Sequence, residues 1–117
     1  MGRLNAVEPR LPVVDLEHSF RFYTETLGFA GDGADASSGF VIVRRDAVAI
    51  QLVHADEHHP SGRFTIWVSV NDAHGEHRTR HNDVEVEWGP EDFPYGRSEF
   101  AILDPDGHRV IFSSALQ

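Results

Sequence analysis

The order of predicted elements repeats along the chain, and this repeat constrains the fold more than any other feature. An apolar strand at residues 10–14 precedes Asp15, a good helix N-cap, and a helix and three strand-like segments follow. The same order restarts at residues 64–70, where Asp72 takes the place of Asp15. A unit of about 50 residues is too small to bury a core alone. The two units must therefore pack on each other or on another chain.

The first helix is the best-defined element of the repeat. One helical face carries Leu16, Phe20, Tyr23 and Leu27. Gly28 then suits the position just past the end of a helix. The second helix, expected over residues 72–82, is poorly amphipathic because Ala73 is its only strongly apolar residue.

Short strands and turns account for the rest of the chain. Strands are expected at residues 40–43, 48–53, 84–88, 99–103 and 109–112. Residues 30–39 predict a loop or weak edge strand, and residues 89–96, with two prolines, predict a loop. We therefore expect a single domain over residues 1–117, with module one at about 6–53, a linker at 54–62 and module two at about 63–113.

The charge balance excludes several classes of partner. Ten Lys and Arg residues against 19 Asp and Glu residues give a net charge of −9, whereas nucleic acids and anionic membranes require a basic surface. The chain has no cysteine, which excludes disulfides, thiolate metal sites and thiol nucleophiles. No targeting segment and no apolar run long enough to span a bilayer is present, so we expect a cytoplasmic protein.

Three stretches carry a resemblance to a known family. They are residues 9–16 (PRLPVVDL) with LGF at 27–29, residues 67–70 (WVSV), and residues 94–107 with the motifs PYG, EFA and DPDG. The combination resembles the vicinal oxygen chelate superfamily of glyoxalase and bleomycin-resistance proteins, and most of all the bleomycin-resistance branch. The resemblance covers about residues 6–112. The pattern departs at Ser98, where the family commonly has an arginine directly before Glu-Phe.

The resemblance implies an α+β fold in which two βαβββ modules form a curved mixed sheet around a cleft. In the bleomycin-resistance branch, two chains build the clefts as a homodimer, often with exchange of N-terminal strands. The implied function is non-catalytic: the protein would sequester a planar, cationic small molecule, for example a bleomycin-type antibiotic. No cofactor and no catalytic residue is expected on this interpretation.

Aromatic side chains and one carboxylate are the candidate ligand contacts. Aromatic rings in a cleft offer flat apolar surfaces for planar ligands and attract cations to their faces. A carboxylate at the border of the cleft could pair with a cationic group. The candidates are Phe40, Trp67, Trp88, Phe93, Tyr95 and Glu99.

Two alternative functions remain open. One is a metal-dependent lyase, isomerase or extradiol dioxygenase of the same superfamily. Its usual ligand positions correspond here to Glu8, Thr65 and Ile111, of which only Glu8 is a good ligand, so the histidines, such as His54, would have to complete the site. The other is a dimeric interaction module without a small-molecule role. The six candidate residues and the missing metal ligands favour the binding protein.

Overall fold

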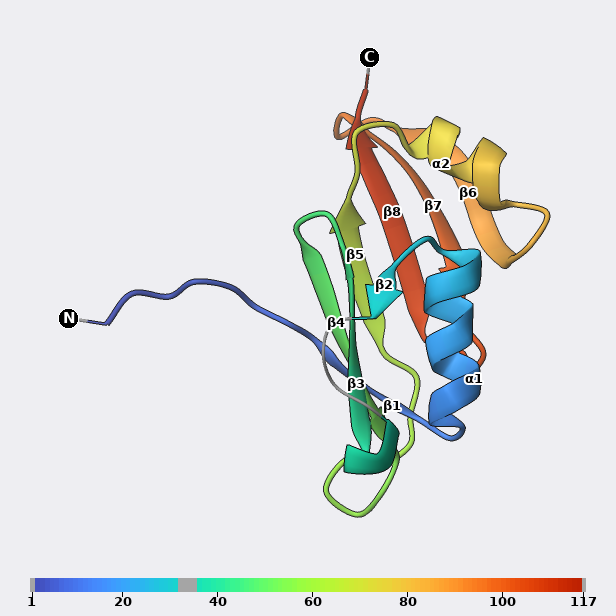
Figure 1. Ribbon diagram of the computed structural model, residues 1–117. Coiled ribbons are helices and arrows are strands. Elements are labelled where there is room, and N and C mark those ends of the chain that lie inside the picture. The colour runs from blue at the N-terminus through green and yellow to red at the C-terminus, as the bar shows by residue number, and fades with distance from the viewer. Residues whose placement is uncertain (1, 32–35, 117) are drawn as a thin grey trace.

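Two successive βαβββ modules make up the computed structural model, which describes residues 2–31 and 36–116 (Figure 1). The first module contains β1 (Arg10–Val13), α1 (Leu16–Arg21), the π-helix η1 (Phe22–Thr26), β2 (Ala30–Gly31), the 3-10 helix η2 (Ala36–Ser38), β3 (Phe40–Arg45) and β4 (Val48–His54). The second contains β5 (Thr65–Ser69), α2 (Ala73–Arg80), β6 (Glu85–Phe93), β7 (Arg97–Leu103) and β8 (Arg109–Ala115). The repeated order and the α+β class predicted from the sequence are confirmed.

The strands form two four-stranded mixed sheets with matching topology. Their orders are β1-β4-β3-β2 and β5-β8-β7-β6. In each sheet the first strand of the module runs parallel to the last one, and the other pairs are antiparallel. Within one chain the eight strands therefore make two separate open sheets.

Each module starts its helix with the same aspartate cap. Asp15 accepts a hydrogen bond from the backbone N–H of His18, and Asp72 accepts one from the backbone N–H of Gly75, both at 3.0 Å. Such a cap satisfies a backbone donor that has no partner within the helix. The predicted equivalence of Asp15 and Asp72 is thus a structural equivalence.

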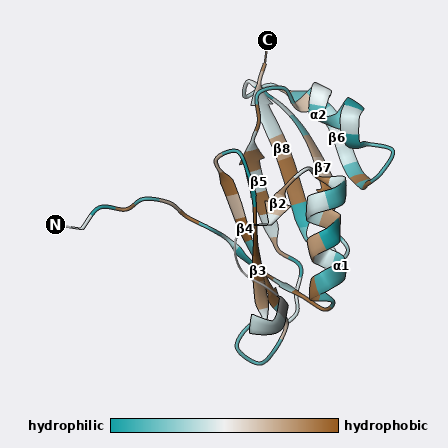
Figure 2. Cartoon of the chain, in the orientation of Figure 1, coloured by the Kyte–Doolittle hydropathy of each residue, from teal (hydrophilic) through white to brown (hydrophobic). Residues whose placement is uncertain are grey.

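The two helices differ in how they are held. Tyr23 and Leu27 are completely buried, as the predicted apolar face of the first helix requires, and Gly28 ends that helix with a φ of +78°. In α2 only Ala73 is buried. In Figure 2 the first helix carries brown segments among teal ones, whereas α2 is mostly white to teal. Apolar burial therefore explains the docking of the first helix far better than that of α2.

Both helices lie on one side of the sheets, away from the extended N-terminal residues (Figure 1). The first helix packs on β3 and β4, and α2 packs on β7 and β8. Phe100 and Phe112 stack beneath α2 with ring centroids 5.2 Å apart. Because side chains alternate along a strand, Glu99 and Ser113 point to the opposite face of the second sheet. No helix in the described ranges is long and apolar enough to cross a membrane.

The β7–β8 turn joins the second module to the first through polar contacts, most of which are buried. The Tyr23 hydroxyl donates to Asp104 at 2.7 Å, and the Val14 N–H donates to Asp106 at 2.8 Å. The fully buried His108 ring donates from Nε2 to the Pro12 carbonyl at 2.7 Å and accepts the Phe64 N–H at Nδ1, 3.1 Å away. These bonds assign the donor role to Nε2 and the acceptor role to Nδ1.

The prediction of a loop at residues 89–96 is wrong over residues 89–93. Strand β6 continues to Phe93 and pairs with β7 beyond a register shift between Trp88 and Glu91. Gly89, with a φ of +85°, lies at the shift, and β6 is an edge strand, where a proline such as Pro90 is tolerated. In the segment 30–39, the structure has the short strand β2 and the helix η2, and residues 32–35 lie outside the described ranges.

Candidate ligand-binding site

Glu99, on β7, is the centre of a polar and aromatic cluster on the face of the second sheet opposite α2. Its carboxylate is buried, with 5% of the residue exposed. The Tyr95 hydroxyl donates to Oε1 at 2.6 Å, the Trp67 indole N–H donates to Oε2 at 3.0 Å, and the Ser113 hydroxyl donates to Oε2 at 2.8 Å. The side chains come from β5, β8 and the turn before β7, so sheet pairing assembles the cluster.

Two further rings extend this cluster along the sheet edge. Phe93 stacks on Tyr95 with ring centroids 5.3 Å apart, and Trp88 meets Phe93 edge to face at 6.1 Å. Together with Glu99 and Trp67 they form one continuous chain of contacts, which we call the aromatic platform: Trp67, Trp88, Phe93, Tyr95 and Glu99. The structure thus brings together five of the six candidate ligand-binding residues predicted from the sequence.

The platform is open to solvent. Trp67 is 54% exposed and Tyr95 is 65% exposed, whereas tryptophan is highly buried on average. A cavity of about 610 Å³ lies elsewhere, on the helix side between the modules, and its walls include Val68 and Phe112 but no platform residue. In a single chain the platform is therefore a surface rather than an enclosed pocket.

Arg97 and Ser113 belong to the cluster but were not nominated from the sequence. The Arg97 guanidinium lies 5.2 Å from the centre of the Trp67 ring, and its Nε and Nη2 donate to the Ser113 hydroxyl and carbonyl at 2.9 and 3.1 Å. The spacing of Arg97 and Glu99 could have identified Arg97 from the sequence, because residues two apart in a strand point to the same face of the sheet. Ser113 is found only through its register with Glu99.

The hydrogen bonds shift the proton equilibria of the cluster. Burial is the largest influence on Glu99 and raises its pKa, but the bonds from Tyr95, Trp67 and Ser113 and the charge of Arg97 outweigh it, so the pKa is lowered. The bond to Glu99 raises the pKa of Tyr95. The platform therefore holds an ionised carboxylate beneath a neutral phenol near neutral pH.

Phe40 is separate from the platform. It lies on β3 in the first sheet, where the Arg10 guanidinium is 5.9 Å from its ring centre. Arg10 also donates to the Gln51 side chain at 2.8 Å. Within one chain Phe40 belongs to a second, smaller cation–aromatic group.

The positions of the superfamily metal frame do not fit a metal. Glu8 accepts a hydrogen bond from Gln51 at 3.2 Å and lies 4.0 Å from Arg44. Thr65 lies 3.4 Å from Arg109, and the side chain of Ile111 has no atom that could bind a metal. His77 and His81 stack their rings at 4.9 Å instead of converging on one point. Over residues 2–31 and 36–116, no three His, Asp or Glu side chains are grouped so that they could hold an ion.

Comparisons with known proteins agree with this architecture. The family sequence model of the Glyoxalase/Bleomycin resistance protein/Dioxygenase superfamily matches residues 3–112 of the chain. The structure is similar to that of the bleomycin-binding protein from bleomycin-producing Streptomyces verticillus complexed with copper(II)-bleomycin, with 25% identity, full coverage of both chains (100% and 100%) and a TM-score of 0.79.

Two further solved structures share the fold. TnmS3, an antibiotic binding protein from Streptomyces sp. CB03234, has 23% identity over 98% of this chain and 99% of its own, with a TM-score of 0.81. A glyoxalase/bleomycin resistance protein/dioxygenase from Nocardioides has 22% identity over 100% and 87%, with a TM-score of 0.74. No curated protein matches the sequence.

Proposed function

Because the chain belongs to the glyoxalase/bleomycin resistance protein/dioxygenase superfamily, we propose that it is a non-catalytic binding protein that sequesters a planar, cationic small molecule. The observation that carries the proposal is the aromatic platform, in which exposed rings are fixed over an ionised carboxylate. Flat rings above a negative charge are the surface that attracts planar cations. The likeness to a protein that binds copper(II)-bleomycin supports the same class of ligand.

The platform needs a second wall to enclose a ligand, and we propose that a second copy of the chain supplies it. Small-molecule sites bury most of the ligand surface, whereas Trp67 and Tyr95 are more than half exposed in one chain. Leu4 and Val7, near the N-terminus, are also almost fully exposed apolar residues. A homodimer would cover these surfaces. Phe40 and Arg10, on the first sheet of the second copy, would then face the aromatic platform and enclose the ligand from the other side.

Titration of the purified protein with copper(II)-bleomycin, followed by tryptophan fluorescence, tests the proposal. The chain has two tryptophans, so Trp67→Phe and Trp88→Phe assign the signal. We expect saturable quenching that Trp67→Phe removes and Trp88→Phe largely retains. Because bleomycin is one member of the class, ethidium serves as a second planar cation. Absence of saturation with both probes at high micromolar concentration would refute the proposed ligand class.

Sedimentation equilibrium tests independently whether the chain forms the proposed homodimer. A mass of two chains is expected at micromolar concentration. A mass of one chain, 13.1 kDa, both with and without probe, would contradict the dimer cleft.

A further inference from the structure

We propose that Glu99 is a positioning residue, which acts on the ligand through Trp67 and Tyr95 by fixing both rings, rather than by touching the ligand. This inference rests on the proposed binding function and specifies how its site is built. The sequence suggested a direct ion pair between Glu99 and a cationic ligand. The contacts of the carboxylate indicate a different role.

Both carboxylate oxygens already have partners. Oε1 accepts from Tyr95 at 2.6 Å, and Oε2 accepts from Trp67 at 3.0 Å and from Ser113 at 2.8 Å. Hydrogen bonds to an ionised acceptor are among the stronger ones in proteins. With 5% of Glu99 exposed, a ligand could reach the carboxylate only by displacing these rings.

Besides the carboxylate, Tyr95 stacks on Phe93 and Trp67 has Arg97 over one face. Trp67 and Tyr95 are 54% and 65% exposed, so neither ring is enclosed by packing, and the hydrogen bond to Glu99 is the contact that they share. One shared carboxylate determines the orientation of both, although they come from β5 and from the turn before β7. Rings that are oriented before binding lose less entropy when the ligand arrives.

The negative charge of Glu99 still acts on the face of Trp67. Arg97 shows this, because its guanidinium lies over that ring at 5.2 Å and contacts Ser113, which in turn donates to Glu99. A cation on the ring face thus interacts with the carboxylate through the ring and Ser113. This arrangement reconciles a buried Glu99 with a cationic ligand.

Glu99→Gln tests the proposal in the free protein, without any ligand. Glu91→Gln is the matched control, since Glu91 is exposed and pairs directly opposite Glu99 on β6. The readout is alkaline titration of tyrosine absorbance. Of the two tyrosines, Tyr23 is completely buried, so the accessible one is Tyr95. Arg97 and Glu91 also influence Tyr95 electrostatically, and the control corrects for Glu91.

We expect the midpoint of the Tyr95 titration to fall towards its ordinary value in Glu99→Gln, and to fall less in Glu91→Gln. Equal midpoints in the two variants would overturn the proposal. If Glu99→Gln does not fold, the exposed Tyr95→Phe variant serves instead, in a Trp88→Phe background where Trp67 is the only tryptophan. Tyr95→Phe should shift Trp67 emission through the shared carboxylate, and an unchanged spectrum would contradict the shared anchor.

Binding of copper(II)-bleomycin then separates the two proposals. We expect Glu99→Gln to bind about tenfold more weakly than Glu91→Gln. Equal affinities would refute positioning by Glu99 while leaving the binding function intact. If the wild-type protein binds neither bleomycin nor ethidium, the proposed function fails, and the tyrosine titration still decides whether Glu99 orients the rings.

Discussion

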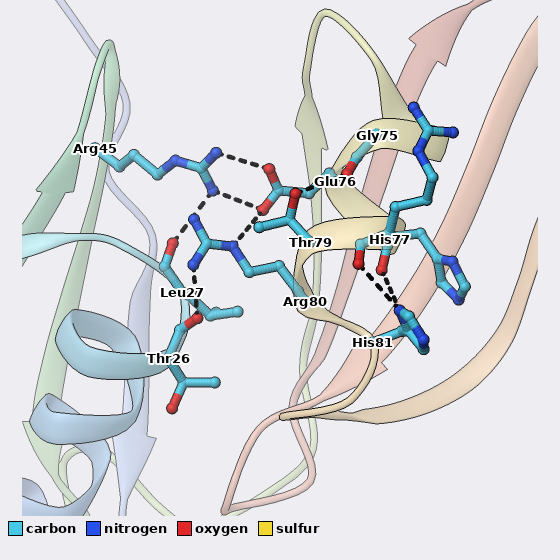
Figure 3. A network of polar contacts seen from close by, with 10 residues as sticks. Thr26, Leu27, Arg45, Gly75, Glu76, His77, Thr79, Arg80 and His81 are labelled. Atoms are coloured by element: carbon cyan, nitrogen blue, oxygen red, sulfur yellow. Dashed lines mark hydrogen bonds and ion pairs between the residues drawn. The ribbon is translucent and has the colours of Figure 1, made fainter.

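Arg45 and Glu76 join the two modules through a bidentate ion pair, in which Nη1 and Nη2 of the arginine lie 2.9 and 2.7 Å from the two carboxylate oxygens (Figure 3). Arg80 donates to the same carboxylate at 3.1 Å and to the Thr26 carbonyl at 3.0 Å, and Arg45 also donates to the Leu27 carbonyl at 3.2 Å. These bonds tie α2 to β3 and to the end of the first helix. They explain how a helix with a single buried apolar residue is held in place.

Glu76→Gln is expected to lower the free energy of unfolding by about 2–3 kcal/mol, since it removes a charged acceptor from two arginines in a half-buried site. Burial raises the pKa of Glu76, but the bonds from Arg45 and Arg80 outweigh it and lower the pKa below its ordinary value of 4.5. The stabilisation is therefore present above pH 4.5 and is lost as the pH falls further. Urea unfolding at pH 7 and at pH 3.5 measures both effects.

The control for this variant is Glu17→Gln, which removes an exposed carboxylate 3.9 Å from Arg21. An exposed pair of this kind contributes little, so we expect a change below about 0.5 kcal/mol. If both variants lose the same amount, or if the loss in Glu76→Gln is as large at pH 3.5 as at pH 7, the ion pair does not hold the modules together.

Tyr23→Phe is expected to lower the free energy of unfolding by about 1–3 kcal/mol, because it removes the hydroxyl that donates to the buried Asp104. Burial raises the pKa of Asp104 in spite of this bond. Loss of the bond raises the pKa of Asp104 in the folded protein further. A carboxyl group whose pKa is raised by folding destabilises the fold once the pH exceeds that pKa, because it must then ionise in a buried site. Tyr23→Phe should therefore lose more stability at pH 7 than at pH 4. Thr24→Val, which removes a hydroxyl that donates to the Phe20 backbone carbonyl instead of a carboxylate, should show no such difference.

Gly89→Ala tests the close approach of β6 to β7. A Cβ at Gly89 would lie 2.6 Å from the Glu99 carbonyl oxygen, which is backbone and cannot move aside, and the φ of Gly89 is +85°. Gly96 has a similar φ of +93° but open space around its Cβ position. We expect Gly96→Ala to cost about 1 kcal/mol for the left-handed backbone and Gly89→Ala more than about 3 kcal/mol. Equal losses of unfolding free energy would show that the register shift relaxes to admit a methyl group.

The sequence predicts the module repeat because local signals agree with it. Asp15 and Asp72 cap their helices, and the apolar face with Tyr23 and Leu27 is buried as its spacing requires. The continuation of β6 past Gly89 could not be predicted, because two prolines within eight residues favour a loop. The cross-strand pairing of Glu91, Asp92 and Phe93 with β7 overrides that local preference.

The site is predictable in its residue types but not in its contacts. Trp67, Tyr95 and Glu99 stand out by chemistry, yet their convergence depends on the register that puts β5, β8 and β7 side by side. The same register brings Ser113 beneath Glu99, and no local pattern marks a serine for that place. Phe40 resembles the other candidates in sequence, but it lies on the other sheet.

Arg97→Gln is expected to increase the affinity for a planar cation. The Arg97 guanidinium occupies one face of Trp67, which is where a ligand cation would gain most from the ring and from Glu99. Removal of this competing charge should tighten ethidium binding about tenfold, as measured by ethidium fluorescence. Arg78→Gln is the control, because it removes the same charge from α2, where Arg78 lies 3.7 Å from Asp72 on the opposite side of the sheet from Trp67. If both variants tighten binding equally, net charge alone is responsible, and if Arg97→Gln weakens it, the arginine contacts the ligand instead of competing with it.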